Sequence, residues 1–530
     1  MSHLDRRTLL RAGGAVAVVS LAGCSDTNDP DATVDPTTSS ASASSTPTTS
    51  APSATRTTPS STPTESITPS DPAETPPSGS AAVPNWNSFA RSLKGRLYLP
   101  ASAGYAASHQ LFNPRWDSVQ PAAVVKAATT ADVQRAIEFA RGNKLVLVPK
   151  SGGHSYVGAS TISKGMMVDV GALDSMSYSN GVLTVGAGAR LYDVHVFLNK
   201  YGRSLPTGTC PTVGVAGLAL GGGEGIHTRA FGLTCDRILS MGVYTADGAS
   251  HNVSASADSD LFWALRGSGG GNLGVVTSFR FATIPAANIG FFRLTWTEAQ
   301  APAVVRGWQR FAQSAPITSW GNLHIDANSN GTLSVHVLGI STTGNASAAA
   351  AQLQSFVGVR AASSSITVKT SMEAVVYLGG GTTSPRTGFL AGSDVLKGPM
   401  DAATITAMIG AVKAAARART PASAIIDPLG GQAAKQPTGG SSWPWRTALG
   451  VIQWYAGTVA HPTTAQLKPA QTFITNGHRA VAKYSAGGYV NYLEAGRSVS
   501  TYYGTSLARL QTVKKKYDPT GFFHTAYTLT

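Results

Sequence analysis

A histidine and a cysteine stand in two separate glycine-rich segments of this 530-residue chain. His154 lies in residues 149–158 (PKSGGHSYVG), and Cys210 lies in residues 208–225 (GTCPTVGVAGLALGGGEG). Glycine has no Cβ, so such segments let the backbone approach a ligand closely. Imidazole and thiol groups are nucleophiles that can bond covalently to a bound group. A histidine beside glycines is also common in turns and cores, and Cys210 has an alternative role in a disulfide with Cys235.

Three further motifs follow along the chain. They are residues 227–236 (HTRAFGLTCD), residues 260–277 (DLFWALRGSGGGNLGVVT) and residues 517–523 (YDPTGFF). In this order, the five segments resemble the berberine bridge enzyme-like branch of the FAD-linked oxidases, in the vanillyl-alcohol oxidase superfamily. The resemblance runs from about Val119 to the end of the chain.

This resemblance implies an FAD that is attached covalently at two points. His154 would bond to the 8α-methyl carbon of the flavin and Cys210 to its C6 atom. Backbone N–H groups around residues 151–155 would surround the pyrophosphate, because consecutive amide donors form an anion-binding concavity. The expected cofactor-binding residues are His154, Cys210, Ser151, Gly152, Gly153, Ser155, Gly158, Val213, Gly214, Gly217, Gly221, Gly222, Gly225, Gly274, Val276 and Asn491. No metal site is predicted.

Residues 488–492 (GYVNY) hold the candidate catalytic base. They resemble the family's Tyr-x-Asn-Tyr strand, which lies over the flavin and carries a tyrosine used as base. In a strand, Tyr489 and Asn491 share one face and Tyr492 takes the other. Both tyrosines are candidates, and Tyr489 is preferred because Asn491 can align beside it. A free phenol has a pKa near 10, so we expect a cation or hydrogen-bond donor that lowers it.

Two other positions bear on catalysis through the same resemblance. Gln453 matches a polar residue above the flavin and is the third candidate catalytic residue. Val213 matches a position where valine accompanies access of oxygen to the flavin and isoleucine accompanies its exclusion. Nearby aromatic side chains either form a surface for a sugar ring or belong to the core; they are Trp443, Trp445, Trp454 and Tyr455.

The implied activity is that of an FAD-dependent oxidase. It would oxidise a hydroxyl group of a carbohydrate or alcohol, pass a hydride to flavin N5, and be reoxidised by O2 with release of H2O2. An enzyme that tailors a secondary metabolite, by alcohol oxidation or oxidative cyclisation, is the first alternative. A surface-anchored binding protein without redox turnover is the second.

Alternating strands and helices in residues 145–201 predict an α+β flavin domain. The resemblance implies a two-part FAD-binding domain of the PCMH type, covering residues 85–285 and completed by a return segment, residues 497–530. Residues 286–496 would form a substrate domain whose antiparallel sheet, backed by helices, lies over the flavin. A strand is also predicted at residues 145–148.

The first 23 residues are typical of an export signal. Arg6 and Arg7 precede an apolar stretch from Ala15 to Ala22, which is too short for a permanent membrane helix. The adjacent arginines favour twin-arginine export. Residues 21–24 (LAGC) resemble a bacterial lipobox with Cys24 as the lipidated residue, and an ordinary signal peptide is the alternative. We expect an exported protein, lipid-anchored at the outer face of a bacterial cytoplasmic membrane or secreted.

Residues 24–84 are nearly all Ser, Thr, Pro, Ala and Asp. This composition cannot bury enough apolar surface to fold, so a disordered stalk is predicted. The formal net charge is +14, but no nucleic-acid motif is present, and the charge indicates solubility or attraction to an anionic envelope. The basic run at residues 514–516 is expected on the solvated face of a helix. We expect a monomer, with a sugar or alcohol and O2 as its small-molecule partners.

Overall fold

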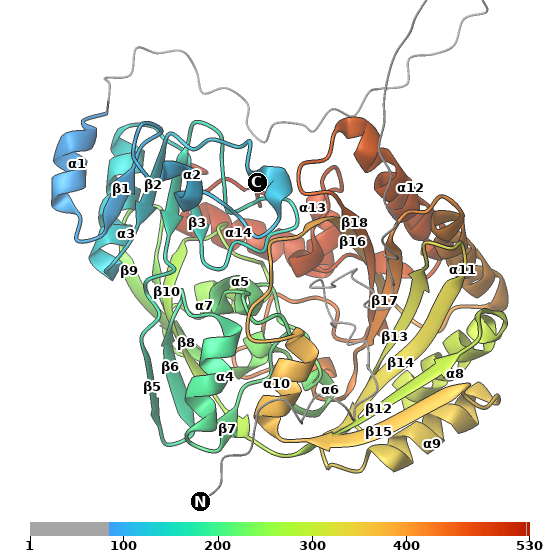
Figure 1. The fold of residues 1–530 in the computed structure, drawn as a ribbon. Coiled ribbons are helices and arrows are strands. Elements are labelled where there is room, and N and C mark those ends of the chain that lie inside the picture. Colours follow the sequence, from blue (N-terminus) through green and yellow to red (C-terminus); the bar gives the residue numbers. More distant parts are fainter. Residues whose placement is uncertain (1–83, 526, 530) are drawn as a thin grey trace, which may run out of the picture. The chain divides into compact units, whose positions relative to one another are not determined.

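A computed structural model describes residues 84–525 and 527–529 (Figure 1). The predicted signal peptide, the lipobox cysteine Cys24 and the predicted stalk, except its last residue, therefore lie outside the described residues. Within the described part of the chain, no helix combines the length and the apolar character needed to cross a bilayer.

The first sheet has four strands in the order β1-β2-β4-β3. Strands β2 and β3 both run parallel to β4, and β1 is antiparallel to β2. Helix α3 (Thr130–Gly142) makes the crossover, and it begins with a capping box in which Thr129 and Asp132 each bond the other's backbone. The bounds are β1 Arg96–Tyr98, β2 Ala123–Lys126, β3 Leu147–Lys150 and β4 Met166–Asp169.

A second, antiparallel sheet has five strands in the order β5-β6-β10-β8-β9. Its strands are β5 Met176–Ser179, β6 Val182–Gly186, β8 Ile238–Tyr244, β9 Ser250–Ser254 and β10 Val275–Ala282. Short strands β7 (Arg203–Ser204) and β11 (Ile284–Pro285) pair beside it. The helices of this half are α1 Trp86–Ser92, α2 Tyr105–Ser108, α4 Leu191–Asn199, α5 Val215–Leu220, α6 Thr228–Phe231 and α7 Ser259–Leu265.

The third sheet has eight antiparallel strands in the order β15-β12-β14-β13-β17-β18-β16-β19. Four long helices cover one of its faces (Figure 1), because alternate apolar residues such as Phe292, Leu294 and Trp296 pack against them. The strands are β12 Ile289–Trp296, β13 Ser319–Ala327, β14 Leu333–Ser341, β15 Ser363–Lys369, β16 Gly388–Leu396, β17 Ala422–Pro428, β18 Gly450–Thr458 and β19 Ser485–Gly487. The covering helices are α8 Ala301–Ser314, α9 Ala346–Val357, α11 Ala402–Arg417 and α12 Thr464–Val481.

The predicted α+β class, with an antiparallel sheet backed by helices, is confirmed. The strand predicted at residues 145–148 begins two residues later, as β3. The strand predicted at residues 488–492 is wrong: residues Val490–Tyr492 form a 3₁₀ turn, η5, in which the Tyr492 amide donates to the Tyr489 carbonyl over 2.8 Å.

The C-terminal segment packs against the first half of the chain. It contains α13 (Val499–Tyr503) and α14 (Leu507–Tyr517), while α10 (Ser371–Gly379) lies beside α4. The expectation of a solvated basic run is wrong for Lys514, which is 2% exposed. Its ammonium group donates to the Asn272 carbonyl over 2.7 Å and pairs with Asp518 at 2.5 Å. Lys514 therefore fastens α14 to the loop before β10.

Candidate functional site

Four chain segments enclose a cavity of about 210 Å³, called here the central cavity. They are residues 151–160 after β3, residues 208–220 leading into α5, residues 268–276 leading into β10, and residues 489–493. Twelve of the predicted cofactor-binding residues line it: Ser151, Gly152, Gly153, His154, Ser155, Cys210, Val213, Gly214, Gly217, Gly274, Val276 and Asn491.

The first two segments touch backbone to backbone. A Cβ atom on Gly152 would lie 2.2 Å from the Gly214 amide nitrogen, and one on Gly214 would lie 2.1 Å from the Ser151 Oγ atom. Only glycine fits at such separations, so both positions are needed to bring the two loops together. These glycines were predicted to let a ligand approach closely; they also let the two loops contact each other.

His154 faces the central cavity from the loop after β3. Its Nε2 atom lies 3.0 Å from the Thr212 hydroxyl, and its ring stacks on Phe112 with centroids 4.0 Å apart. Burial, helped by the charge of Arg190, lowers the pKa of His154 to about 3. The imidazole is therefore neutral at physiological pH, which leaves one ring nitrogen with a free lone pair for bonding to carbon.

Cys210 lies on the second segment, two residues before the threonine that touches His154, and is 7% exposed. The alternative disulfide with Cys235 is wrong, because Cys235 is a free, fully buried thiol. Burial raises the pKa of Cys235 well above its usual value, which makes it an inert core residue. Val213 lies in the same cavity wall as Cys210. Its amide donates a hydrogen bond to the Cys210 carbonyl and so closes a turn between them.

Tyr489 is 2% exposed and receives three N–H donors at its phenol oxygen. The Gly223 amide donates over 2.8 Å, the Glu224 amide over 3.3 Å and the Asn491 side-chain amide over 2.9 Å. These donors stabilise the phenolate, yet burial and the Glu224 carboxylate outweigh them and raise the pKa of Tyr489 above its usual value. The expected donors are thus present, but the expected net lowering of the pKa is not.

Tyr492 and Gln453 both contact Tyr156. Tyr492 lines the cavity and stacks on Tyr156, with centroids 5.3 Å apart and planes 5° from parallel. Gln453 is fully buried and is absent from the cavity wall. Its side-chain amide donates to the Tyr156 hydroxyl over 2.5 Å. Gln453 is therefore a residue that positions Tyr156, rather than one placed to touch a molecule in the cavity.

Glu224 is a cavity residue for which sequence reasoning assigned no role. It is 8% exposed, and neither of its carboxylate oxygens has a hydrogen-bond partner. Burial and the nearby Asp427 raise the pKa of Glu224 well above its usual value, although Tyr492 acts in the opposite direction. A lone acidic residue in the run GGGEG was the available signal, because glycine-rich loops at ligand sites expose few side chains.

Some predicted positions are structural. Gly158, Gly221, Gly222 and Gly225 do not line the central cavity; a Cβ atom on them would approach Trp116, Asn491, Trp443 and Thr207 respectively. The aromatic residues proposed as a sugar surface also lie outside the cavity wall, and Trp443, Trp445 and Trp454 belong to the hydrophobic core. The aromatic walls are instead formed by Phe112, Tyr156, Phe389, Tyr489, Tyr492, Tyr503 and Tyr527.

The cavity fits the demands of FAD. In the described structure, the amides of Gly152, Gly153, His154 and Ser155 donate to no protein acceptor. The buried Ser268 hydroxyl, which also lines the cavity, has no hydrogen-bond partner either. Consecutive free amides bind anionic groups such as a pyrophosphate, and aromatic walls suit a flat ring system. Residues 151–155 would hold the phosphates, and His154, Cys210 and Asn491 would adjoin the ring.

Comparisons with known proteins agree with this geometry. Residues 121–254 match the family described as "FAD binding domain", and residues 488–527 match "Berberine and berberine like". An uncharacterised FAD-linked oxidoreductase, YgaK of Bacillus subtilis, is 30% identical over 423 residues, covering 76% of this chain and 90% of that protein. A carbohydrate oxidase of Microdochium nivale is 28% identical and covers 80% of this chain and 91% of its own.

Solved structures show the same architecture. The BBE-like 1 protein of Physcomitrella patens superposes with a TM-score of 0.78 at 26% identity, covering 84% of this chain and 98% of that one. The Microdochium nivale carbohydrate oxidase, solved with a substrate analogue, gives a TM-score of 0.76 over the same shares. Sequence, fold and site together show that the chain belongs to the berberine bridge enzyme-like family of FAD-linked oxidoreductases.

Proposed function

We propose that this protein is an oxidase of carbohydrate hydroxyl groups whose FAD is bonded covalently to His154 and Cys210. The observation that carries the proposal is the placing of Tyr489, with its three N–H donors, in the wall of the same cavity that His154 and Cys210 line. The Microdochium nivale relative, named as a carbohydrate oxidase, supports the choice of substrate class.

The chemistry divides between the cofactor and the chain. When bound, FAD accepts the hydride at its N5 atom. Tyr489 acts as a phenolate, whose negative charge the amides of Gly223, Glu224 and Asn491 stabilise, and it becomes a neutral phenol when it takes the proton from the substrate hydroxyl. Preorganised donors of this kind act strongly because the site is buried.

The aromatic walls are suited to orient a sugar. Tyr156 and Tyr492 form a parallel stack, and Phe389 meets Tyr156 edge-on with centroids 4.9 Å apart. Flat apolar faces of this size pack against the C–H face of a pyranose, while the phenol hydroxyls bond to its hydroxyls. Gln453 holds Tyr156 in place from behind.

Molecular oxygen is the proposed electron acceptor, with H2O2 as its product. Val213 lines the cavity beside Cys210, and its small side chain leaves room near the ring that a larger one would fill. We also propose export through the signal in residues 1–23 and anchoring through Cys24. Incorporation of labelled palmitate into the wild-type chain but not into Cys24→Ala tests the anchor.

The covalent cofactor is tested by acid precipitation of the purified protein. A pellet that stays yellow after redissolving, with flavin mass on peptides containing His154 and Cys210, supports the proposal. Flavin that remains in the supernatant, or Cys210 joined to another cysteine, overturns the double attachment. Release of H2O2 on addition of mono- and oligosaccharides tests the activity, and its absence with every sugar while another alcohol is oxidised refutes the substrate class.

A further inference from the structure

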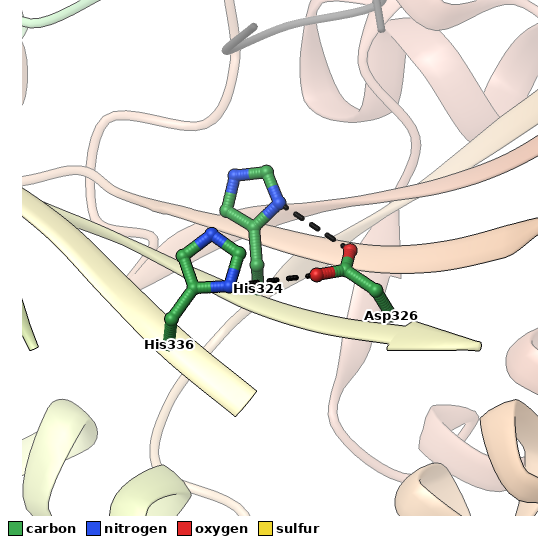
Figure 2. Close-up of side chains that lie close together, drawn as sticks. All are labelled: His324, Asp326 and His336. Atoms are coloured by element: carbon green, nitrogen blue, oxygen red, sulfur yellow. Dashed lines mark ion pairs between the residues drawn. The ribbon is translucent and has the colours of Figure 1, made fainter. Parts of the chain in front are cut away.

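The large sheet carries a second group of chemically active side chains outside the central cavity. His324 and Asp326 lie on β13, and His336 lies on β14. The register places His324 directly opposite His336, and residues two apart on a strand share a face. All three side chains therefore project from the same face of the sheet, and Figure 2 shows both rings and the carboxylate turned toward one another.

The distances within this group suit a metal ion. Asp326 lies 3.6 Å from the Nδ1 atom of His324 and 3.5 Å from the Nδ1 atom of His336, through different carboxylate oxygens. One ligand atom from each residue lies within 4.8 Å of the others. Zinc bonds of about 2.0–2.1 Å in a tetrahedron separate neighbouring donor atoms by about 3.4 Å. Each histidine nitrogen already lies at about this distance from one Asp326 oxygen, and small rotations of the carboxylate and the rings would bring one oxygen and both nitrogens to it.

Three of the four imidazole nitrogens of His324 and His336 lack the hydrogen bonds that buried histidines usually make. His324 is 1% exposed and His336 is 2% exposed. Neither nitrogen of His324 has a hydrogen-bond partner, and the Nε2 atom of His336 has none either. Buried polar atoms almost always have a partner, so three orphan nitrogens beside a carboxylate point to a bound ligand. A metal ion would take the Nδ1 lone pairs, and water would serve the Nε2 atoms.

We propose that His324, Asp326 and His336 form a binding site for a divalent first-row transition metal ion, with Zn²⁺ as the best match. Two imidazole nitrogens and one carboxylate oxygen are ligands that Zn²⁺ prefers, and water would complete the tetrahedron. None of the three residues lines the central cavity, so the ion would be separate from the flavin. It would join β13 to β14 where their side chains meet.

Zinc binding to the purified, tag-free protein tests this site. The wild-type chain is stripped with EDTA, dialysed against Zn²⁺ and analysed by inductively coupled plasma mass spectrometry. We expect one equivalent per chain in the wild type and affinity weakened at least about 100-fold in His336→Gln and Asp326→Asn. His251→Gln is the matched control, because His251 pairs with Asp258 elsewhere, and it should retain the full equivalent.

A second readout does not depend on the variants folding. Co²⁺ in a tetrahedral site gives visible d–d bands, recorded as a difference spectrum against the metal-free protein. Such bands in the wild type, lost when one equivalent of Zn²⁺ displaces the Co²⁺, support the site. A wild type that binds no zinc, or folded variants that bind as much as the wild type, overturns it, and circular dichroism identifies which variants are folded.

Discussion

The side chains of Tyr489 and Asn491 meet although the chain between them is a 3₁₀ turn and not a strand. The Asn491 amide nitrogen lies 2.9 Å from the Tyr489 phenol oxygen and also donates to the Leu218 carbonyl over 3.0 Å. Asn491 thus ties the turn to α5. The amides of Gly223 and Glu224 donate to the same phenol oxygen. The base and its supporting donors form one rigid group.

Replacing Tyr489 by Phe should lower turnover by about 10²–10⁴-fold, the usual contribution of a general base. Flavin content should be unchanged, because attachment uses other residues. Tyr492→Phe should have a smaller effect, and Tyr201→Phe, at an exposed position, should have none. Steady-state peroxide release measures all three. Equal losses in the Tyr489 and Tyr492 variants would contradict the assignment of the base.

Long elements with regular periodicity could be predicted from the sequence. The apolar pattern predicts a helix at residues 402–416 and a strand at residues 291–296. Helix α11 and strand β12 lie within two residues of these bounds, because such patterns arise from burial of one face. The turn at Tyr489 could not be predicted this way. Its shape depends on the Ser393 hydroxyl, which accepts from the Tyr489 amide, and on amides some 266 residues away. Tertiary contacts there override the alternating pattern.

The site could be predicted where chemistry is tied to local glycine-rich motifs, as at His154 and Cys210. The site could not be predicted where the role of a residue depends on how deeply its side chain is buried. Gln453 was predicted to be catalytic and Trp445 to belong to a sugar surface or the core, and neither lines the cavity. Glu224 is marked only as the lone acidic residue of the run GGGEG, a pattern that does not show that its side chain is buried. Burial of a single polar side chain depends on elements from several parts of the chain, so it leaves little trace in the sequence around it.

Replacing Glu224 by Gln should shift the acid limb of kcat/KM to lower pH. The Glu224 carboxylate raises the pKa of Tyr489, so removing its charge lets the phenol ionise more easily. The expected shift is on the order of one pH unit. Peroxide release measured from pH 5 to 10 gives the profile. An unchanged limb would show that Glu224 is already protonated there and does not tune the base.

Replacing Val213 by Ile should slow reoxidation of the reduced enzyme by oxygen. The added methylene group fills space in the cavity wall beside Cys210. A fall of at least about 10-fold, equal to about 1.4 kcal/mol in the barrier, is expected. Stopped-flow mixing of the reduced protein with oxygenated buffer measures it, with Val459→Ile at an exposed site as control. Equal rates would remove the case for oxygen access through this position.

Replacing Asp236 by Asn should destabilise the fold strongly. Arg446 bonds the Asp236 carboxylate through both terminal nitrogens, over 2.7 and 2.8 Å, and both side chains are 8% exposed. Removing one charge leaves a buried guanidinium unpaired, which costs about 3–5 kcal/mol. Denaturant unfolding gives the loss. Asp260→Asn, which breaks a pair with the exposed Lys516, should cost less than about 1 kcal/mol.

The network around His478 should make stability depend on pH. Its Nδ1 atom lies 2.5 Å from Asp394 and its Nε2 atom 2.8 Å from Glu494. Burial alone would lower the pKa of His478, but these two carboxylates raise it to about 9. Because the folded-state pKa exceeds the unfolded value of about 6.5, the stabilisation is fully present below pH 6.5 and is lost as the pH rises through 9.

The loss should be on the order of 2 kcal/mol between those limits, since each unit of pKa difference corresponds to about 1.4 kcal/mol and the imidazole keeps some contact with solvent. Denaturant unfolding at a series of pH values gives the slope. His478→Gln, which cannot titrate, should flatten the curve in this window, whereas His251→Gln should not. A wild-type curve that is flat from pH 6.5 to 9, or a His478→Gln curve of the same slope, would refute the link, because in either case another group sets the dependence.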